Sequence, residues 1–198
     1  MTINVFLDTE FTELSKPGSL VSIGLINELG DRTFYAELTD TFSRPACSEF
    51  VLRNVLPLLD ARPLAEWPGH DNIHAKMSLA ETRQHLQQWF ADQVDPIQIW
   101  CDSPHYDWFY FQEIFPAGFP SSLIQTPKSV FVGDSLLKEL FEKKVVREYR
   151  VRRLIRHHPL QDAMAVRLGW LEIKSLVTTS NQFAGLLPYF NNLDLGQH

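Results

Sequence analysis

Three β-type segments stand close together at the start of the chain and constrain its fold more than any other feature. Residues 20–26, LVSIGLI, are almost all apolar, as expected for a strand that is covered on both faces. Residues 32–38 alternate apolar and polar side chains, which is typical of a strand with one buried face. Because short turn signals join these segments to each other and to residues 3–7, an antiparallel meander is predicted.

Helical patterns and two more β-type segments follow the meander. Helices are predicted at residues 48–60, from Ser78, from about Tyr106, after Asp134 and from near Pro159. Strands are predicted at residues 97–101 and 129–132, and the first is reached through a long helical crossover, so it should lie parallel to a neighbour. The sequence therefore predicts one α/β domain over residues 1–198, with a mixed five-stranded sheet flanked by helices.

Composition limits the classes of protein that fit the chain. With 198 residues, of which 44% are hydrophobic, the chain can bury one sizeable core. It has no apolar run long enough to span a membrane and no signal-like start. Cys47 and Cys101 are not spaced like metal ligands and are interpreted as reduced thiols. We therefore expect a cytoplasmic protein with no membrane partner.

Charge is unevenly distributed along the chain. The formal net charge is −6, yet residues 143–156 carry seven Lys and Arg side chains against the single acid Glu148. A charge run of this kind is often a solvated helix face, and it also suits contact with an anionic partner. Both interpretations stay open from the residues alone.

Two carboxylates end the first predicted strand. Asp8 and Glu10 are two residues apart, so they share a face if the strand continues through them. Like charges held close together raise each other's pKa or need a cation. Carboxylate oxygens of this kind suit Mg²⁺ or Mn²⁺. The pair alone also fits a solvated strand end.

Two further acids and a histidine stand at helix starts. Asp107 lies within an aromatic stretch, residues 106–111, where it either interacts with the helix dipole or is buried with a compensating partner. Asp162 lies in the first turns of a helix, next to its apolar stripe. His157 precedes that helix and directly follows the basic segment, where a loop imidazole could take a proton.

Together, these motifs resemble the DEDDh family of 3′–5′ exonucleases, which share the RNase H-like fold. The matching residues are Asp8 and Glu10 in DTE, Asp107 in YDWFYF, and His157 with Asp162 in HHPLQDA. The resemblance spans about residues 3–170 and looks closest to the short stand-alone exoribonucleases of bacteria and their viruses. The chain departs from the family pattern at residue 13, where Glu13 stands in place of a frequent Gly, and in its doubled histidine.

The resemblance implies a two-metal-ion phosphodiester hydrolase. Asp8, Glu10, Asp107 and Asp162 would hold two Mg²⁺ or Mn²⁺ ions, about 3.5–4 Å apart in sites of this kind. His157, whose spacing fits the family better than that of His158, would be the general base. Nearby cations and arginines should favour its neutral form. The products would be nucleoside 5′-monophosphates released from RNA 3′ ends.

The resemblance also suggests how substrate is bound. Phe11 and Leu14 would pack against the terminal bases, Thr12 would contact the sugar, and Arg152 and Arg153 would follow the phosphates. The expected partner is single-stranded RNA or an RNA 3′ overhang, with DNA also possible. A homodimer is possible because relatives often dimerise. The alternatives are a 3′–5′ DNA exonuclease, a small-oligonucleotide phosphodiesterase and a non-catalytic nucleic-acid-binding module.

Overall fold

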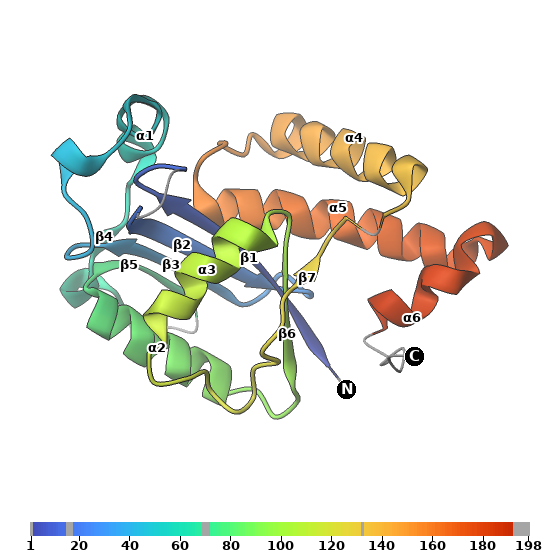
Figure 1. The fold of residues 1–198 in the computed structure, drawn as a ribbon, viewed down its shortest axis with the longest axis horizontal. Coiled ribbons are helices and arrows are strands. Elements are labelled where there is room, and N and C mark those ends of the chain that lie inside the picture. The colour runs from blue at the N-terminus through green and yellow to red at the C-terminus, as the bar shows by residue number, and fades with distance from the viewer. Residues whose placement is uncertain (1, 15–17, 69–71, 132, 192–198) are drawn as a thin grey trace.

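A mixed sheet of seven strands forms the centre of the computed structural model, which describes residues 2–14, 18–68, 72–131 and 133–191 (Figure 1). The order of the strands across the sheet is β4-β5-β3-β2-β1-β6-β7. In chain order the strands are β1 (Ile3–Phe11), β2 (Leu20–Asn27), β3 (Thr33–Leu38), β4 (Arg62–Pro63), β5 (Ile73–Met77), β6 (Ile97–Cys101) and β7 (Lys128–Ser129).

The pairing of the central strands confirms the predicted meander. β1 pairs with β2 and β2 pairs with β3, both antiparallel. β6 lies on the other side of β1 and runs parallel to it, with Phe6 opposite Trp100. The α/β class and the parallel crossover strand are therefore confirmed. The carboxyl ends of β1 and β6 meet at one edge, where loops can bring side chains from several elements together.

The predicted number of strands is wrong, since the described sheet has seven rather than five. β4 and β5 extend it beyond β3, with β5 parallel to β3 and β4 parallel to β5. β5 alternates buried and exposed side chains. It was not predicted because it is short and follows a region rich in turn residues. β7 contains only Lys128 and Ser129, so the strand predicted at 129–132 overlaps it at one residue.

The described helices are α1 (Glu49–Asn54), α2 (Leu79–Ala91), α3 (Pro104–Ile114), α4 (Ser135–Arg152), α5 (Pro159–Thr179) and α6 (Leu187–Phe190), with 3₁₀ turns at Arg44–Ala46, Leu56–Leu58, Leu64–Glu66 and Asn181–Leu186. The capping box of Ser78 and Glu81 and the Asp134 cap are confirmed. The helix predicted at 48–60 ends at Asn54, because Pro57 has no N–H for a continuing helix. In the part of the chain that is described, every helix is too short or too polar to cross a membrane.

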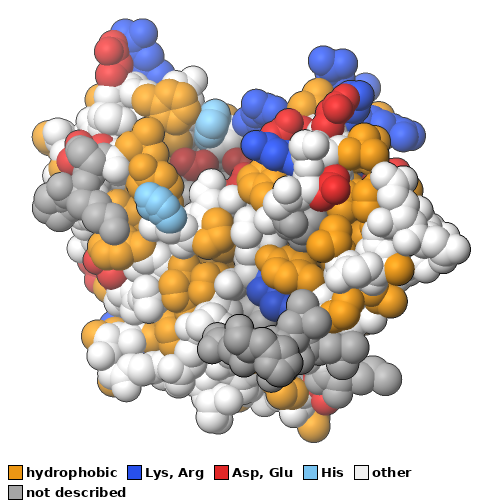
Figure 2. Space-filling view, turned by 45° about the vertical axis from the view of Figure 1, so that its right-hand side comes forward, with side chains coloured by type: hydrophobic (Ala, Val, Ile, Leu, Met, Phe, Trp, Pro, Cys, Tyr) orange, Lys and Arg blue, Asp and Glu red, His pale blue; other side chains and the backbone are white. Residues whose placement is uncertain are grey.

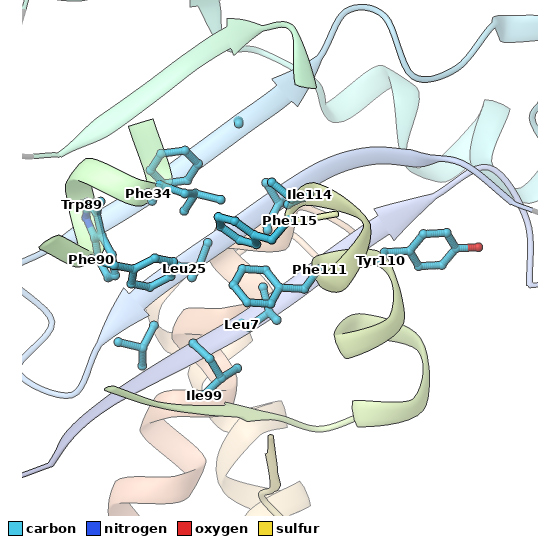
Figure 3. Packing of buried hydrophobic residues seen from close by; sticks show 14 of the residues in the cluster. Leu7, Leu25, Phe34, Trp89, Phe90, Ile99, Tyr110, Phe111, Ile114 and Phe115 are labelled. Atoms are coloured by element: carbon cyan, nitrogen blue, oxygen red, sulfur yellow. The ribbon is translucent and has the colours of Figure 1, made fainter. Parts of the chain in front are cut away.

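Helices cover both faces of the sheet and bury two hydrophobic layers. α2 and α3 pack on one face, where Phe111 of α3 lies over Leu7 and Ile99 (Figure 3). α5, backed by α4, packs on the other face, and Trp170 of α5 contacts Phe6 edge to face at 5.2 Å between ring centroids. Alternate residues of β1 therefore face opposite layers, and Asp8 continues the face of Phe6 that α5 covers.

Gly24 lets α5 approach the sheet closely. It lies directly opposite Asp8 in the pairing of β1 with β2. A Cβ at residue 24 would overlap the backbone of Pro159 and Leu160, well inside the 3.0 Å that Cβ atoms normally keep from other atoms. Only glycine fits this contact, and the contact places the first turn of α5, with Asp162, over the end of β1.

Candidate active site

The four acids predicted as metal ligands meet at the carboxyl end of β1. Asp8 and Glu10 point from β1, Asp107 comes from the first turn of α3, and Asp162 comes from the first turn of α5. In the described part of the chain, two groups have ligand atoms within 4.8 Å of one another and could each hold an ion: Asp8 with Asp102 and Asp107, and Glu10 with His157 and Asp162.

Hydrogen bonds fix two of these carboxylates. The backbone N–H and the hydroxyl of Thr9 both donate to Asp107 Oδ1, at 3.1 and 2.8 Å. The hydroxyl of Tyr149 donates to Asp162 Oδ1, and the backbone N–H of His157 donates to Asp162 Oδ2 at 2.8 Å. The fold therefore sets the orientation of both side chains from three neighbouring segments.

The remaining oxygens suit a divalent cation. Among the described residues, Asp8 Oδ2 and Asp107 Oδ2 are buried without any hydrogen-bond partner. A buried carboxylate oxygen without a donor is costly unless a proton or a cation compensates it. A set of carboxylate oxygens matches the ligands of Mg²⁺ and Mn²⁺. The residues present therefore fit the metal ions that the sequence predicts.

The acids strongly perturb one another in the metal-free protein. Burial raises the pKa of Glu10 to about 8, and the charges of Asp162 and Asp107 add to the effect. Burial also raises the pKa of Asp107 to about 8 and that of Asp162 to about 6. The pKa of Asp8 is raised well above its usual value by burial and then by these neighbours. Carboxylates in this cluster are thus hard to ionise together without added positive charge.

His157 lies beside the acids. Its Nδ1 is 3.9 Å from Glu10 Oε1, and its ring contacts Phe50 edge to face at 4.9 Å between centroids. The residue has a φ of 65°, a left-handed conformation that is uncommon outside glycine and is often found at functional sites. Burial, followed by the charge of Arg156, lowers the pKa of His157, so its neutral form is favoured at neutral pH.

His158 faces a different part of the molecule. It is only 7% exposed and stacks on Tyr35 with ring centroids 4.5 Å apart. Its Nε2 is 3.7 Å from Asp60 Oδ1. The structure therefore places the first histidine of the pair with the acids and the second in the packing between β3 and α5.

A groove of about 530 Å³ adjoins the acids. Its lining is mostly apolar and includes Glu10, Phe11, Leu14 and Phe50. The ring of Phe11 stacks on Tyr110 of α3 with centroids 4.5 Å apart, which holds it in place. Phe50 and Leu14 are both more than half exposed. Two of the residues predicted to contact bases, Phe11 and Leu14, therefore line one cavity next to Glu10.

Thr12 lies away from this groove. It is 3% exposed, and its hydroxyl accepts a hydrogen bond from the backbone N–H of Ser19 at 2.9 Å. Its carbonyl accepts the N–H of Ser48, the N-cap of α1, at 2.8 Å. In the structure, Thr12 bonds to Ser19 and to the start of α1, and it is not among the described residues that line the groove.

The basic segment forms the last turns of α4 and the loop after it. Arg152 donates from Nε to Glu148 Oε2 at 2.8 Å, whereas Arg153 ends the helix at a φ of 57° and is exposed. Figure 2 shows acidic side chains inside a hollow of the surface, with Lys and Arg gathered on one side and hydrophobic groups on the other. A positively charged wall thus stands near the acidic centre.

Three residues of the site were missing from the sequence-based set. Asp102 follows β6 and belongs to the group of Asp8 and Asp107. Tyr149 stands in the middle of the basic segment, and Phe50 lies on α1. A carboxylate directly after a strand that pairs with β1 was a usable signal for Asp102. The contacts of Tyr149 and Phe50 depend on how helices pack, which no local pattern reveals.

Comparison with known proteins adds no assignment. No protein-family model matches the chain, and no curated protein matches it. The arguments for a function are therefore the positions and the chemistry of the side chains described above.

Proposed function

We propose that the protein is a metal-dependent 3′–5′ exonuclease with an RNase H-like fold, which removes nucleoside 5′-monophosphates from single-stranded RNA or from RNA 3′ overhangs. One observation carries the proposal: Asp8, Glu10, Asp107 and Asp162 converge from three elements on one end of the sheet. Burying that many acids together has no structural benefit and is explained by binding of cations.

Divalent ions would be held by these four carboxylates. When bound, Mg²⁺ or Mn²⁺ supplies Lewis-acid polarisation of the scissile phosphate and of the attacking water. The hydrogen bonds from Thr9 to Asp107 and from Tyr149 to Asp162 keep the carboxylates oriented. This scaffold reduces the reorganisation that the acids would otherwise undergo as the reaction proceeds.

His157 is the residue that takes the proton from the attacking water. Its lowered pKa keeps the imidazole unprotonated at neutral pH, the form that a general base needs. Contacts with Glu10 and Phe50 hold the ring at the edge of the centre. Its side chain is 41% exposed, so the proton can pass from the ring to solvent after each cycle.

The groove and the arginines support recognition of a nucleic-acid 3′ end. The apolar lining from Phe11, Leu14 and Phe50 suits the face of the terminal base, and such stacking tolerates any sequence. Because Glu10 belongs to the same lining, a base in this groove would place its phosphate near the acids. Arg153 and the other exposed arginines of residues 147–156 would hold phosphates further along the strand.

The 3′ end of DNA is a second candidate substrate. Thr12, the residue expected to contact the sugar, is buried, and its hydroxyl accepts a hydrogen bond from Ser19. The expected sugar contact therefore gives no preference for ribose over deoxyribose. The same acids, base and groove would hydrolyse DNA, so the test has to include both polymers.

The proposal is tested with matched RNA and DNA oligomers, each labelled at the 5′ end, in the presence of Mg²⁺ or Mn²⁺. Stepwise shortening with release of nucleoside monophosphates is expected for the wild type. Asp8→Asn should reduce the rate by about 10³-fold or more while the protein stays folded. Asp92→Asn, the same change at an exposed acid that pairs with Arg32, is the matched control. The proposed enzymatic activity would be refuted if Asp8→Asn cleaved at the wild-type rate, or if the wild type bound RNA without cleaving it.

A further inference from the structure

Asp102 enters the acidic centre from the strand next to β1. The parallel register of β1 and β6 sets Phe6 opposite Trp100. β6 ends at Cys101, so Asp102 is the first residue after that strand, at the end of the sheet where β1 carries Asp8. This position brings the carboxylate of Asp102 close to those of Asp8 and Asp107.

The three carboxylates Asp8, Asp102 and Asp107 have oxygens that all lie within 4.8 Å of one another. Asp107 is only 3% exposed, and its Oδ1 already accepts two hydrogen bonds from Thr9. Its Oδ2, like that of Asp8, is buried and has no hydrogen-bond partner among the described residues. Unpartnered buried oxygens within a group of three acids point to a bound cation at this position.

The two candidate ion positions differ in charge. The group of Asp8, Asp102 and Asp107 offers three carboxylates, whereas the other group offers two, Glu10 and Asp162, beside the imidazole that the proposed function reserves for proton transfer. The number of charged ligands tunes the affinity of an oxygen site for divalent cations. Three carboxylates more than balance the charge of one divalent ion, so this position needs no phosphate to complete its neutralisation.

We propose that Asp102 is a fifth carboxylate ligand of the centre, and that with Asp8 and Asp107 it holds one divalent cation before nucleic acid binds. The inference rests on the metal centre of the proposed function. It adds one ligand, Asp102, and the order in which the two ion positions are occupied. The position at Glu10 and Asp162 fills more weakly, since it offers one carboxylate fewer.

The test is calorimetric titration of the metal-free protein with Mn²⁺ in the absence of nucleic acid. The wild type is expected to show one tight uptake event, and Asp102→Asn to weaken that event at least tenfold. Glu10→Gln should weaken the tight event less than Asp102→Asn does, because Glu10 belongs to the other group and acts on Asp8 only through its charge. Asp92→Asn, which removes the same charge from the surface, should bind as the wild type does.

A thermal melt of each variant with and without Mn²⁺ separates ligation from a structural role. Asp102→Asn removes a charge that repels its neighbours and keeps a side-chain oxygen that can accept the hydrogen bonds from Ser103. The metal-free variant should therefore melt no lower than the wild type, and its rise in melting temperature with Mn²⁺ should be smaller. Two results for Asp102→Asn would overturn the role of Asp102 and leave the proposed nuclease intact. One is a lower melting temperature without metal together with the same rise on adding Mn²⁺ as in the wild type, and the other is an unchanged affinity for Mn²⁺. Absence of Mn²⁺ uptake by the wild type would instead overturn the metal centre itself.

Discussion

Gly24→Ala should damage the candidate active site from a position that carries no functional group. The added Cβ would overlap the backbone of Pro159 and Leu160, the first turn of α5. To restore ordinary van der Waals contact, at 3.4 Å or more, this turn must move away from β2 by about 1 Å. Asp162 lies in the same turn and would move with it, away from Glu10 and His157.

The expected size of the effect follows from this displacement. Forcing an extra carbon into a packed contact typically costs about 1–3 kcal/mol of unfolding free energy. For a chain of this length, each kcal/mol lowers the melting temperature by roughly 2–4 °C. A misplacement of about 1 Å at a catalytic centre can reduce the rate on the order of 100-fold. The loss of activity should therefore exceed what partial unfolding at 25 °C explains.

The assay compares melting temperature, Mn²⁺ affinity and the rate of RNA cleavage for Gly24→Ala and for Gly185→Ala. A Cβ at residue 185 meets nothing within 4 Å, so the second variant controls for the loss of glycine flexibility. We expect only Gly24→Ala to lose stability and rate. Wild-type stability and cleavage in Gly24→Ala would show that the close approach of α5 to β2 does not position Asp162.

Substitutions of the two histidines should differ in their effects on cleavage and on stability. The metal-free and Mn²⁺-bound proteins should differ in how their stability depends on pH. His157→Asn, which tolerates the left-handed backbone, should lower the cleavage rate by about 10²–10⁴-fold at an unchanged melting temperature. His158→Ala should instead lose the ring contact with Tyr35, about 0.5–1.5 kcal/mol of stability; the reverse ranking in cleavage assays would move the base by one residue. Because the folded pKa values of Glu10 and Asp107, both about 8, exceed their unfolded values, the folded protein binds the extra protons, and stability should fall as pH rises from about 4 to about 8. Melting curves with saturating Mn²⁺ should lose this slope, and a slope that persists would place the cation elsewhere.

Local sequence patterns predict those elements of the fold that depend on interactions between neighbouring residues. The meander follows from side-chain alternation and short turns, and the starts of α2, α4 and α5 follow from Ser78, Asp134 and Pro159. β5 escaped prediction because five alternating residues beside turn-rich sequence carry too little signal. Its place in the sheet is decided by pairing with β3, a contact between distant segments.

The candidate site shows the same difference between what local sequence patterns indicate and what contacts between distant segments decide. The strand period placed Asp8 and Glu10 on one face and the helix starts placed Asp107 and Asp162, but only the resemblance to the exonuclease family joined the four acids into one predicted site. The place of Asp102 directly after a strand was visible in the sequence, but its contact with Asp8 depends on the pairing of β1 with β6, which a single sequence does not contain. The role of Thr12 depends on a loop hydrogen bond to Ser19, so a residue expected at the substrate is found inside the fold.

The basic segment lies close to the acids without neutralising them, and the contacts of α4 explain why. The guanidinium of Arg156 lies over the ring of Tyr149 at 5.0 Å, while the hydroxyl of Tyr149 donates to Asp162. Arg152 is held by Glu148, a buried acid of its own helix. The arginines nearest the centre are thus tied to α4 instead of entering the acidic cluster. The charge of Arg156 still reaches Asp162, where it opposes the rise in the pKa of that carboxyl. Under the proposed function, the acids would remain available for cations and the exposed arginines for phosphates, because a direct ion pair between the two groups would occupy both.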